Sequence, residues 1–170
     1  MKPELDSTIK ALRKVFKAKS SEFRGDVTVD ITPENIVDAC KMMRDDMGFT
    51  QLLTMTAVDL GPGKSPRFNV LYYFISMTDN LRLGILVPVS GEKPTLPTIT
   101  GVFRNANWRE RELWDMFGIK FEGHPDMRRI LMPAEWDGHP LRKDFPLGYE
   151  EPQFTFNYRE IDDRKPYAKE

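Results

Sequence analysis

Three apolar segments in the middle of the chain decide its fold: TQLLTMTAVDL (residues 50–60), RFNVLYYFISM (67–77) and LRLGILVPV (81–89). The third alternates apolar with other side chains, which is typical of a half-buried strand. The second is apolar on both faces, so we expect it to be a central strand. Turns at Gly61-Pro62-Gly63 and at residues 78–80 separate the segments. Together they predict an antiparallel meander of three strands.

The chain before this meander predicts a helix, a strand and a second helix. Residues 26–31 alternate polar and apolar side chains, as a half-buried strand does. Residues 32–34, Thr-Pro-Glu, favour a helix start, and Gly48 favours its end. Because a helix links them, strand 26–31 and strand 50–60 are able to run parallel. The two helices have apolar stripes at Leu5, Ile9, Leu12 and Phe16, and at Ile36, Cys40, Met43 and Met47.

A further helix is expected after a proline-containing loop at residues 91–100. We predict it over Trp108–Phe117, with Asn107 as its N-cap, Glu110 in a capping box and Gly118 at its end. The predicted fold class is therefore α/β (α+β), a mixed β-sheet with helices packed on one face. We assign this α/β domain to residues 1–120.

The remainder of the chain, residues 121–170, has a different character. It holds six of the thirteen prolines and shows no clear periodicity, yet it is rich in aromatic residues. These are Phe121, Trp136, Phe145, Tyr149, Phe154, Phe156, Tyr158 and Tyr167. An extended aromatic segment has few ways to bury itself alone. We interpret residues 121–170 as a C-terminal strap that orders along a partner protein.

Composition excludes several classes of function. A net charge of −1 argues against a nucleic-acid-binding protein, which needs a basic face. One cysteine and two histidines are too few for a cysteine-rich iron–sulfur or zinc site. No apolar run approaches the roughly 20 residues that span a membrane, and we expect no signal peptide. Cys40 is expected in the core, with a reactive thiol as the alternative.

Charged residues are densest between positions 108 and 131. Arg111 and Asp115 are four residues apart and Arg109 and Glu112 three apart, so each pair is able to meet on a helix. Because an arginine holds a carboxylate ionised, we favour a structural ion-pair network over acid–base catalysis by Glu112 and Asp115. The adjacent Arg128 and Arg129 are able to bind a phosphate, or a carboxylate of a partner.

Two Gly-His-Pro triplets, at residues 123–125 and 138–140, form a short internal echo that we interpret as recurrent turn chemistry. A metal bound by His124 and His139 would also need acids such as Asp126 or Asp137, so we expect no metal. The sequence has no nucleophile elbow, phosphate-binding loop or dinucleotide fingerprint.

The same region resembles a known family. Its motifs are ERE (110–112), DMFG (115–118), FEGHPD (121–126), RRIL (128–131) and WDGHPLRKDFPL (136–147). They are similar to the signature of the C subunit of respiratory complex I, the proton-pumping NADH–quinone oxidoreductase. A looser match continues through Gln153-Phe154 and residues 165–168. Met127 departs from the usual leucine, which is a volume-conserving change.

The resemblance implies a hydrophilic, non-catalytic subunit of the peripheral arm with an α/β fold. It implies no redox cofactor and no metal in this chain, with flavin and iron–sulfur clusters in partner subunits. The partners would be the D subunit, along which the C-terminal stretch would lie, and the cluster-bearing subunits of the quinone-reducing module. We expect the D subunit to be a separate chain. The resemblance carries over eight positions as structural or interface residues: Glu110, Arg111, Glu112, Asp115, His124, Arg128, Arg129 and His139.

Two alternatives stay open at the level of sequence. One is the equivalent subunit of a related membrane complex that is linked to ferredoxin, deazaflavin or a hydrogenase. The other is a stand-alone hydrolase or isomerase that uses Glu112, Asp115 and His124. Since we see no transit peptide, the expected location is the cytoplasmic side of the inner (cell) membrane, with attachment to the membrane only through the complex.

Overall fold

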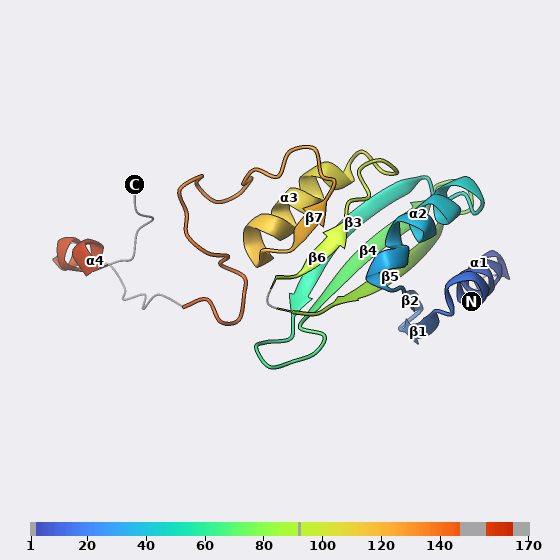
Figure 1. The fold of residues 1–170 in the computed structure, drawn as a ribbon, viewed down its shortest axis with the longest axis horizontal. Coiled ribbons are helices and arrows are strands. Elements are labelled where there is room, and N and C mark those ends of the chain that lie inside the picture. The colour runs from blue at the N-terminus through green and yellow to red at the C-terminus, as the bar shows by residue number, and fades with distance from the viewer. Residues whose placement is uncertain (1–2, 92, 147–155, 165–170) are drawn as a thin grey trace.

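The structure is a computed structural model that describes residues 3–91, 93–146 and 156–164. Its elements follow the order of a mixed α/β domain with an extended C-terminal part (Figure 1). The helices are α1 (Pro3–Phe16), α2 (Ile36–Asp45), α3 (Ala106–Phe117) and α4 (Tyr158–Arg164), with a 3-10 turn η1 (Pro33–Asn35) before α2. The strands are β1 (Lys19–Phe23), β2 (Asp26–Asp30), β3 (Gln51–Asp59), β4 (Phe68–Ser76), β5 (Leu81–Val89), β6 (Thr95–Pro97) and β7 (Lys120–Glu122).

The main sheet has five strands in the order β1-β2-β5-β4-β3. The predicted meander β3–β4–β5 is antiparallel throughout, which confirms that part of the fold. Strand β2 pairs in parallel with β5, with Val29 opposite Ile85. Strands β2 and β3 therefore run in the same direction, as predicted, but they are not neighbours. The predicted mixed sheet is confirmed.

The core lies between one face of this sheet and the helices. Side chains on β4 alternate strictly, with Phe68, Val70, Tyr72 and Phe74 fully buried. Leu12 of α1, the stripe residues Ile36, Cys40 and Met43 of α2, and Leu113 of α3 join the same buried cluster. Helices α1, α2 and α3 therefore cover this face, as predicted (Figure 1). The opposite face of β3 carries the exposed Leu53 and Val58.

Several local predictions differ from the structure. Strand β1, in which every residue is exposed, was not predicted because it has no apolar alternation. Helix α3 begins at Ala106 rather than Trp108, and neither Asn105 nor Asn107 caps it through a side chain. The capping box is wrong because the buried Glu110 side chain accepts hydrogen bonds from Thr98 and Ile99 instead of from the start of the helix. Gly118 ends the helix in the left-handed conformation, as predicted.

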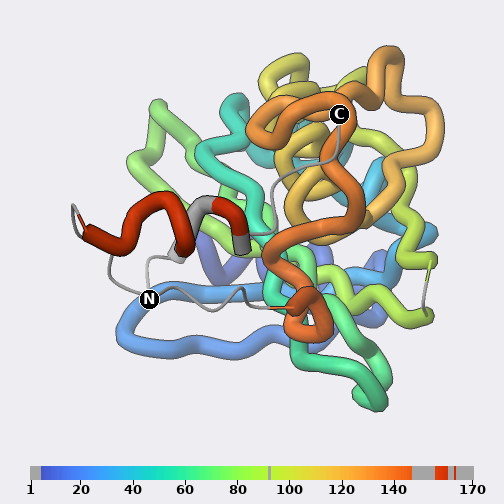
Figure 2. Tube along the Cα trace, turned by 90° about the vertical axis from the view of Figure 1, so that its left-hand side faces the viewer, coloured from blue at the N-terminus to red at the C-terminus, as the bar shows by residue number. Residues whose placement is uncertain are grey.

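Residues 123–146 contain no regular element and follow a long path beside α3 to the end of the sheet (Figures 1 and 2). The segment is extended and lies against the chain's own α/β domain (Figure 1). Trp136 and Phe145 stack on each other within it, with ring centroids 6.3 Å apart. Phe121 belongs to β7, which pairs in parallel with β6. The division of the chain at residues 120 and 121 stays a prediction, as does the docking of the strap on a partner.

The far end of the predicted strap is described only in part. Residues 158–164 form the short helix α4, which the sequence did not predict. Phe156 is 86% exposed there. The aromatic residues Tyr149, Phe154 and Tyr167, and the looser motif at residues 165–168, lie outside the described residues.

Candidate functional site

The principal polar site of the chain joins the C-terminal half of α3 to residues 123–146. We call it the clasp and define it by the side chains of Arg111, Asp115, Arg129, His139 and Arg142. The first two lie on α3 and the others on the extended segment. In Figures 1 and 2 this segment lies beside α3, which places the two halves of the clasp together.

Asp115 lies at the centre of the clasp, with its side chain fully buried. One carboxylate oxygen accepts hydrogen bonds from the backbone N–H groups of residues 130–132, at 2.8–3.0 Å. The other accepts from the Arg129 guanidinium at 2.5 Å. Burial alone would raise the pKa of Asp115, but these four donors outweigh it and lower the pKa. The group is therefore an ionised anchor that fixes the backbone of three consecutive residues.

Two of the three arginines of the clasp, Arg129 and Arg111, bind backbone carbonyl groups of the extended segment. Arg129 donates to the carbonyls of Trp136 and Gly138, at 2.6 and 3.1 Å. Arg111 donates to the carbonyls of Arg128 and Arg129, both at 2.9 Å. Polar backbone groups of an irregular segment need partners. The arginines supply them, which explains how a segment without regular structure keeps one path.

Each of the two Gly-His-Pro triplets places a histidine against a backbone carbonyl of α3. Gly123 and Gly138 both have positive φ, at 80° and 83°. The His124 Nε2 lies 3.2 Å from the carbonyl of Asn107, and the His139 Nδ1 lies 3.0 Å from the carbonyl of Asp115. These carbonyls are eight residues apart, or about 12 Å along the helix. The echo is thus turn chemistry, as predicted, and each turn presents a histidine to α3.

Glu110 forms a second, more deeply buried cluster with His124. Both side chains are fully buried, and Glu110 Oε2 lies 4.0 Å from His124 Nε2. Glu110 accepts from the Thr98 hydroxyl at 2.5 Å and from the Ile99 N–H at 2.8 Å. Burial raises the pKa of Glu110 to about 7, although these two bonds oppose the shift. His124 Nδ1 accepts from the Asp126 N–H, so the ring hydrogen lies on Nε2.

The end of the extended segment is held at the β3–β4 turn. Asp59 accepts from the Lys143 N–H at 2.9 Å and from two guanidinium nitrogens of Arg67, at 3.0 and 3.1 Å. Arg67 also donates to Asp144 at 2.7 Å. Burial would raise the pKa of Asp59, but Arg67 and the backbone donors at Lys143 and Gly61 lower it to about 2.

The remaining predicted site residues form exposed ion pairs. Arg109 pairs with Glu112 at 3.4 Å, as predicted from their spacing. Arg128 pairs with Asp126 at 2.7 Å, and its side chain is 79% exposed, whereas that of Arg129 is 13% exposed. The two adjacent arginines therefore have different environments.

The predicted pair Arg111–Asp115 is wrong. Arg111 contacts the carbonyls of the extended segment, and Asp115 takes Arg129 in its place. Asp115 is ionised as predicted, but a different arginine holds it in that form. The role of these residues at an interface with another chain stays a prediction.

Sequence reasoning missed Asp59, Arg67 and Arg142 as parts of the site. Arg142 donates to the carbonyl of Phe117 at 2.6 Å and so binds the end of α3. Lys143 and Asp59 are 84 residues apart, and no spacing rule connects positions so distant. Arg142 lies within the motif at residues 136–147, which was an available signal for it, whereas Asp59 and Arg67 were marked only by charged residues close to prolines and glycines.

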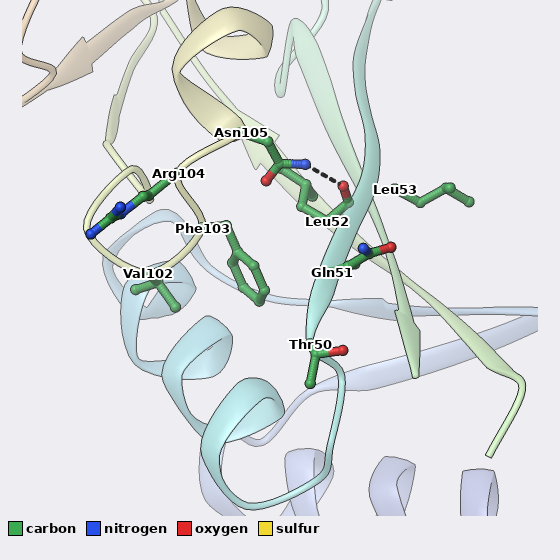
Figure 3. Close-up of a pocket in the computed structure, with 8 residues that line it drawn as sticks. All are labelled: Thr50, Gln51, Leu52, Leu53, Val102, Phe103, Arg104 and Asn105. Carbon is green, nitrogen blue, oxygen red and sulfur yellow. Dashed lines mark hydrogen bonds between the residues drawn. The ribbon is translucent and has the colours of Figure 1, made fainter. Parts of the chain in front are cut away.

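A separate pocket lies at the start of β3 (Figure 3). It has a volume of about 510 Å³ and is lined by residues 50–53 and 102–105. Asn105 donates to the carbonyl of Leu52 at 2.7 Å, which ties the start of α3 to β3. None of the lining residues is an acid, a histidine or a cysteine, so the pocket offers no general acid or base that would activate the Thr50 hydroxyl. Among the described residues, no three His, Cys, Asp or Glu side chains group to hold a metal.

Cys40 lies fully buried in α2. Its thiol is free, and burial, together with nearby Glu110, raises its pKa. A thiol that does not ionise is a poor nucleophile. The prediction of a core residue is therefore confirmed.

Comparison with known proteins identifies the family. A family model described as "Respiratory-chain NADH dehydrogenase, 30 Kd subunit" matches residues 29–151. The chain belongs to this family. The match includes the clasp and the segment that it holds, and it confirms the resemblance seen in the sequence motifs.

Curated relatives extend this result. The chain is 50% identical over 153 residues to the C subunit of the NADH-quinone oxidoreductase of Roseiflexus sp. (strain RS-1), covering 89% of this chain and 87% of the relative. It is 48% identical over 126 residues to the protein of that name from Geotalea uraniireducens, covering 74% of this chain and 76% of the relative.

Solved structures show the same fold. A trypsin-resistant fragment of Nqo5 superposes with a TM-score of 0.65 at 30% identity, covering 72% of this chain and 98% of that chain. A chain of an archaeal membrane-bound sulfane sulfur reductase superposes with a TM-score of 0.74, covering 99% of this chain and 97% of that one. At 21% identity the second likeness supports the fold alone. No helix within the described residues is long and apolar enough to cross a membrane.

Proposed function

We propose that this chain is the non-catalytic C subunit of a proton-translocating NADH–quinone oxidoreductase. In this role it would scaffold the quinone-reducing module and present its C-terminal strap to the D subunit. The observation that carries the proposal is the clasp, in which buried Asp115 and Arg129 hold an irregular segment along α3. A segment fixed through its backbone leaves side chains free to contact a partner. Leu131 and Leu141 are 61% and 54% exposed on it.

Three further parts of the proposal follow from this role. The chain would carry no cofactor of its own, and flavin and iron–sulfur clusters would belong to partner subunits. Its partners would include the D subunit and the cluster-bearing subunits of the peripheral arm. It would lie on the cytoplasmic side of the cell membrane and reach the membrane only through the complex.

The geometry argues against a stand-alone hydrolase or isomerase built on Glu112, Asp115 and His124. The side chain of Glu112 is 40% exposed beside Arg109, whereas Asp115 is buried and bound by four donors. Both ring nitrogens of His124 have backbone partners. An acid–base site needs its groups around one cleft, each with a hydrogen-bonding position that is open to a substrate. These three groups are separated and, in two cases, fully engaged.

The test is purification of the tagged chain from membranes of its native host under mild detergent, followed by mass spectrometry. The expected result is a cluster-rich complex with quinone-reductase activity that contains the D subunit and NADH-oxidising subunits. A complex with ferredoxin-, deazaflavin- or hydrogen-linked subunits would replace the NADH assignment with one of these donors. A chain recovered alone, even after mild crosslinking, would overturn the proposal.

A second experiment tests the strap. Removal of residues 148–170 should leave the domain folded but weaken its assembly with the D subunit, because the clasp and the core lie before that point. The yield of complex on native gels measures the effect. An unchanged yield would show that these residues do not bind the D subunit.

A further inference from the structure

A second pocket lies at the other end of the sheet from the pocket in Figure 3, and it is strongly basic. Its volume is about 820 Å³. Five of the thirteen residues that line it carry a positive charge and one, Asp144, carries a negative charge. The positively charged residues are Lys64, Arg67, Lys93, Lys120 and Arg142. The whole chain has a net charge of −1, so the excess of positive side chains around this pocket is a local feature of the molecule.

The charge is left unbalanced within the described part of the chain. Arg67 pairs with Asp59 and Asp144. Lys64, Lys93 and Lys120 are exposed, and no carboxylate of residues 3–91, 93–146 or 156–164 forms an ion pair with them. Like charges at short range oppose each other. A pocket of this kind gains most from a ligand that brings several negative charges.

Burial, and after it neighbouring arginines, lower the pKa values of two lining groups, Arg142 and His139. Burial lowers the pKa of Arg142, and the neighbouring Arg67 lowers it further. Burial also lowers the pKa of His139, with Arg142 and Arg129 acting in the same direction. Both groups lie where a positive charge is disfavoured, so an anion in the pocket would stabilise their charged forms.

We propose that this pocket binds an acidic, extended segment of another subunit of the complex, with its Asp or Glu side chains on Lys64, Lys93 and Lys120. The inference rests on the proposed function, which supplies the partner chains. The three lysines come from three separate places: the β3–β4 loop, the β5–β6 loop and β7. One phosphate is too small for a pocket of 820 Å³, whereas a peptide with spaced carboxylates fits it. Trp114 adds an aromatic wall for an apolar residue between the acids.

The pocket also depends on the clasp, because it is lined partly by the α/β domain and partly by the extended segment that the clasp holds. Gly118 has a φ of 71°, and a Cβ atom there would lie 2.5 Å from both Arg142 Nη2 and His139 Cδ2. Only glycine therefore lets these two side chains lie against the end of α3. The pocket is completed when residues 139–144 are in place.

The test uses a zero-length carbodiimide crosslinker, which joins a lysine amine to a carboxylate in direct contact, on the purified complex. Mass spectrometry is expected to find Lys64, Lys93 or Lys120 joined to an Asp or Glu of another subunit. Crosslinks of these lysines only within this chain would overturn the proposal. So would a complex in which other lysines of the chain react and these three do not. Failure to recover any complex would instead count against the proposed function.

A charge-matched pair of variants provides the second readout. Lys64→Gln/Lys93→Gln/Lys120→Gln should lower the affinity of the complex for its acidic subunit about tenfold, because each exposed pair contributes a factor of a few. Arg13→Gln/Lys14→Gln/Lys19→Gln removes the same charge from α1 and β1 and should leave the affinity unchanged. Equal losses of affinity in the two triple variants would indicate a general charge effect and overturn the proposal. Protection of the three lysines by inorganic phosphate, with no partner crosslink, would indicate a small-anion site and overturn it as well.

Discussion

Asp115 and Arg129 are fourteen residues apart in the chain and form a contact of 2.5 Å in which the aspartate is fully buried and the arginine 13% exposed. The contact ties a regular helix to a segment without regular structure. Because the aspartate also takes three backbone N–H groups, loss of its partner affects the path of the chain as well as one ion pair.

The adjacent arginines 128 and 129 allow a direct test of this contact. Arg129→Ala should lower the free energy of unfolding by about 3–5 kcal/mol, because it leaves a buried carboxylate without its cation. Urea denaturation measures the loss. Amide hydrogen exchange at residues 130–132 should become faster at the same time.

Arg128→Ala is the matched control. Its side chain is 79% exposed and, among the residues that the structure describes, forms an ion pair with Asp126 alone, so the expected change is within about 0.5 kcal/mol. Equal losses in the two variants would mean that the clasp does not depend on the buried pair.

The raised pKa of Glu110 predicts that the stability of the fold decreases as the pH rises from about 4.5 to about 7. Folded Glu110 keeps its proton up to about pH 7, whereas the ordinary pKa of the group is 4.5. The folded state therefore binds more protons between these values, and the free energy of unfolding decreases with pH across that window, by about 3 kcal/mol. Glu110→Gln, which does not ionise, should lack this decrease.

The comparison is best made by urea denaturation at pH 5 and pH 8. Glu112→Gln serves as the control, because Glu112 is 40% exposed beside Arg109 on the same helix. It should follow the wild-type dependence on pH. A Glu110→Gln protein that loses as much stability as the wild type between the two values would show that Glu110 is ionised in the folded state throughout.

Much of the fold was predictable because its signals are local. The alternation of residues 81–89 and the two-sided apolar pattern of 67–77 specify strands without knowledge of distant residues. The stop at Gly118 is equally local. In contrast, β1 is exposed at every position, and β6 and β7 have three residues each, so no periodicity marks them.

The site was predictable in its residue types but not in its contacts. The motifs indicated Asp115 and Arg129, yet helical spacing favoured Arg111 as the partner of Asp115. The path of the extended segment decided otherwise, because it presents Arg129 and three free N–H groups to the same carboxylate. The contact of Asp59 with Lys143 spans 84 residues, a distance at which one sequence holds no pairing signal.

The lowered pKa of Asp59 predicts that the folded protein loses stability in acid. Its pKa is lowered to about 2 in the folded protein, against an ordinary value of 3.8. Its contribution to the free energy of unfolding is complete above about pH 4 and is lost as the pH falls toward 2. Asp59→Asn should therefore be less stable than the wild type at pH 6, and the difference should shrink by pH 2.

The measurement is the dependence of urea denaturation on pH between 2 and 6. Asp30→Asn, at the exposed end of β2, is the control and should unfold as the wild type does. A constant difference between Asp59→Asn and the wild type over this range would show that the carboxylate contributes only through neutral hydrogen bonds.

Gly118 offers the last test, because it joins the end of α3 to the clasp and to the basic pocket. Gly118→Ala has two costs: a left-handed φ of 71°, worth about 1 kcal/mol, and contact of the new methyl group with Arg142 and His139 at 2.5 Å. Gly25→Ala has a similar φ of 89° but nothing within 4 Å of the new atom, so it measures the backbone cost alone. We expect Gly118→Ala to be the more destabilising by at least about 1 kcal/mol in urea denaturation, with faster amide exchange at Arg142 and Lys143, whose N–H groups bond the His139 carbonyl and Asp59. If the two variants lose equal stability, Arg142 and His139 can move away from α3 at no cost, and the clasp does not hold this end of the segment.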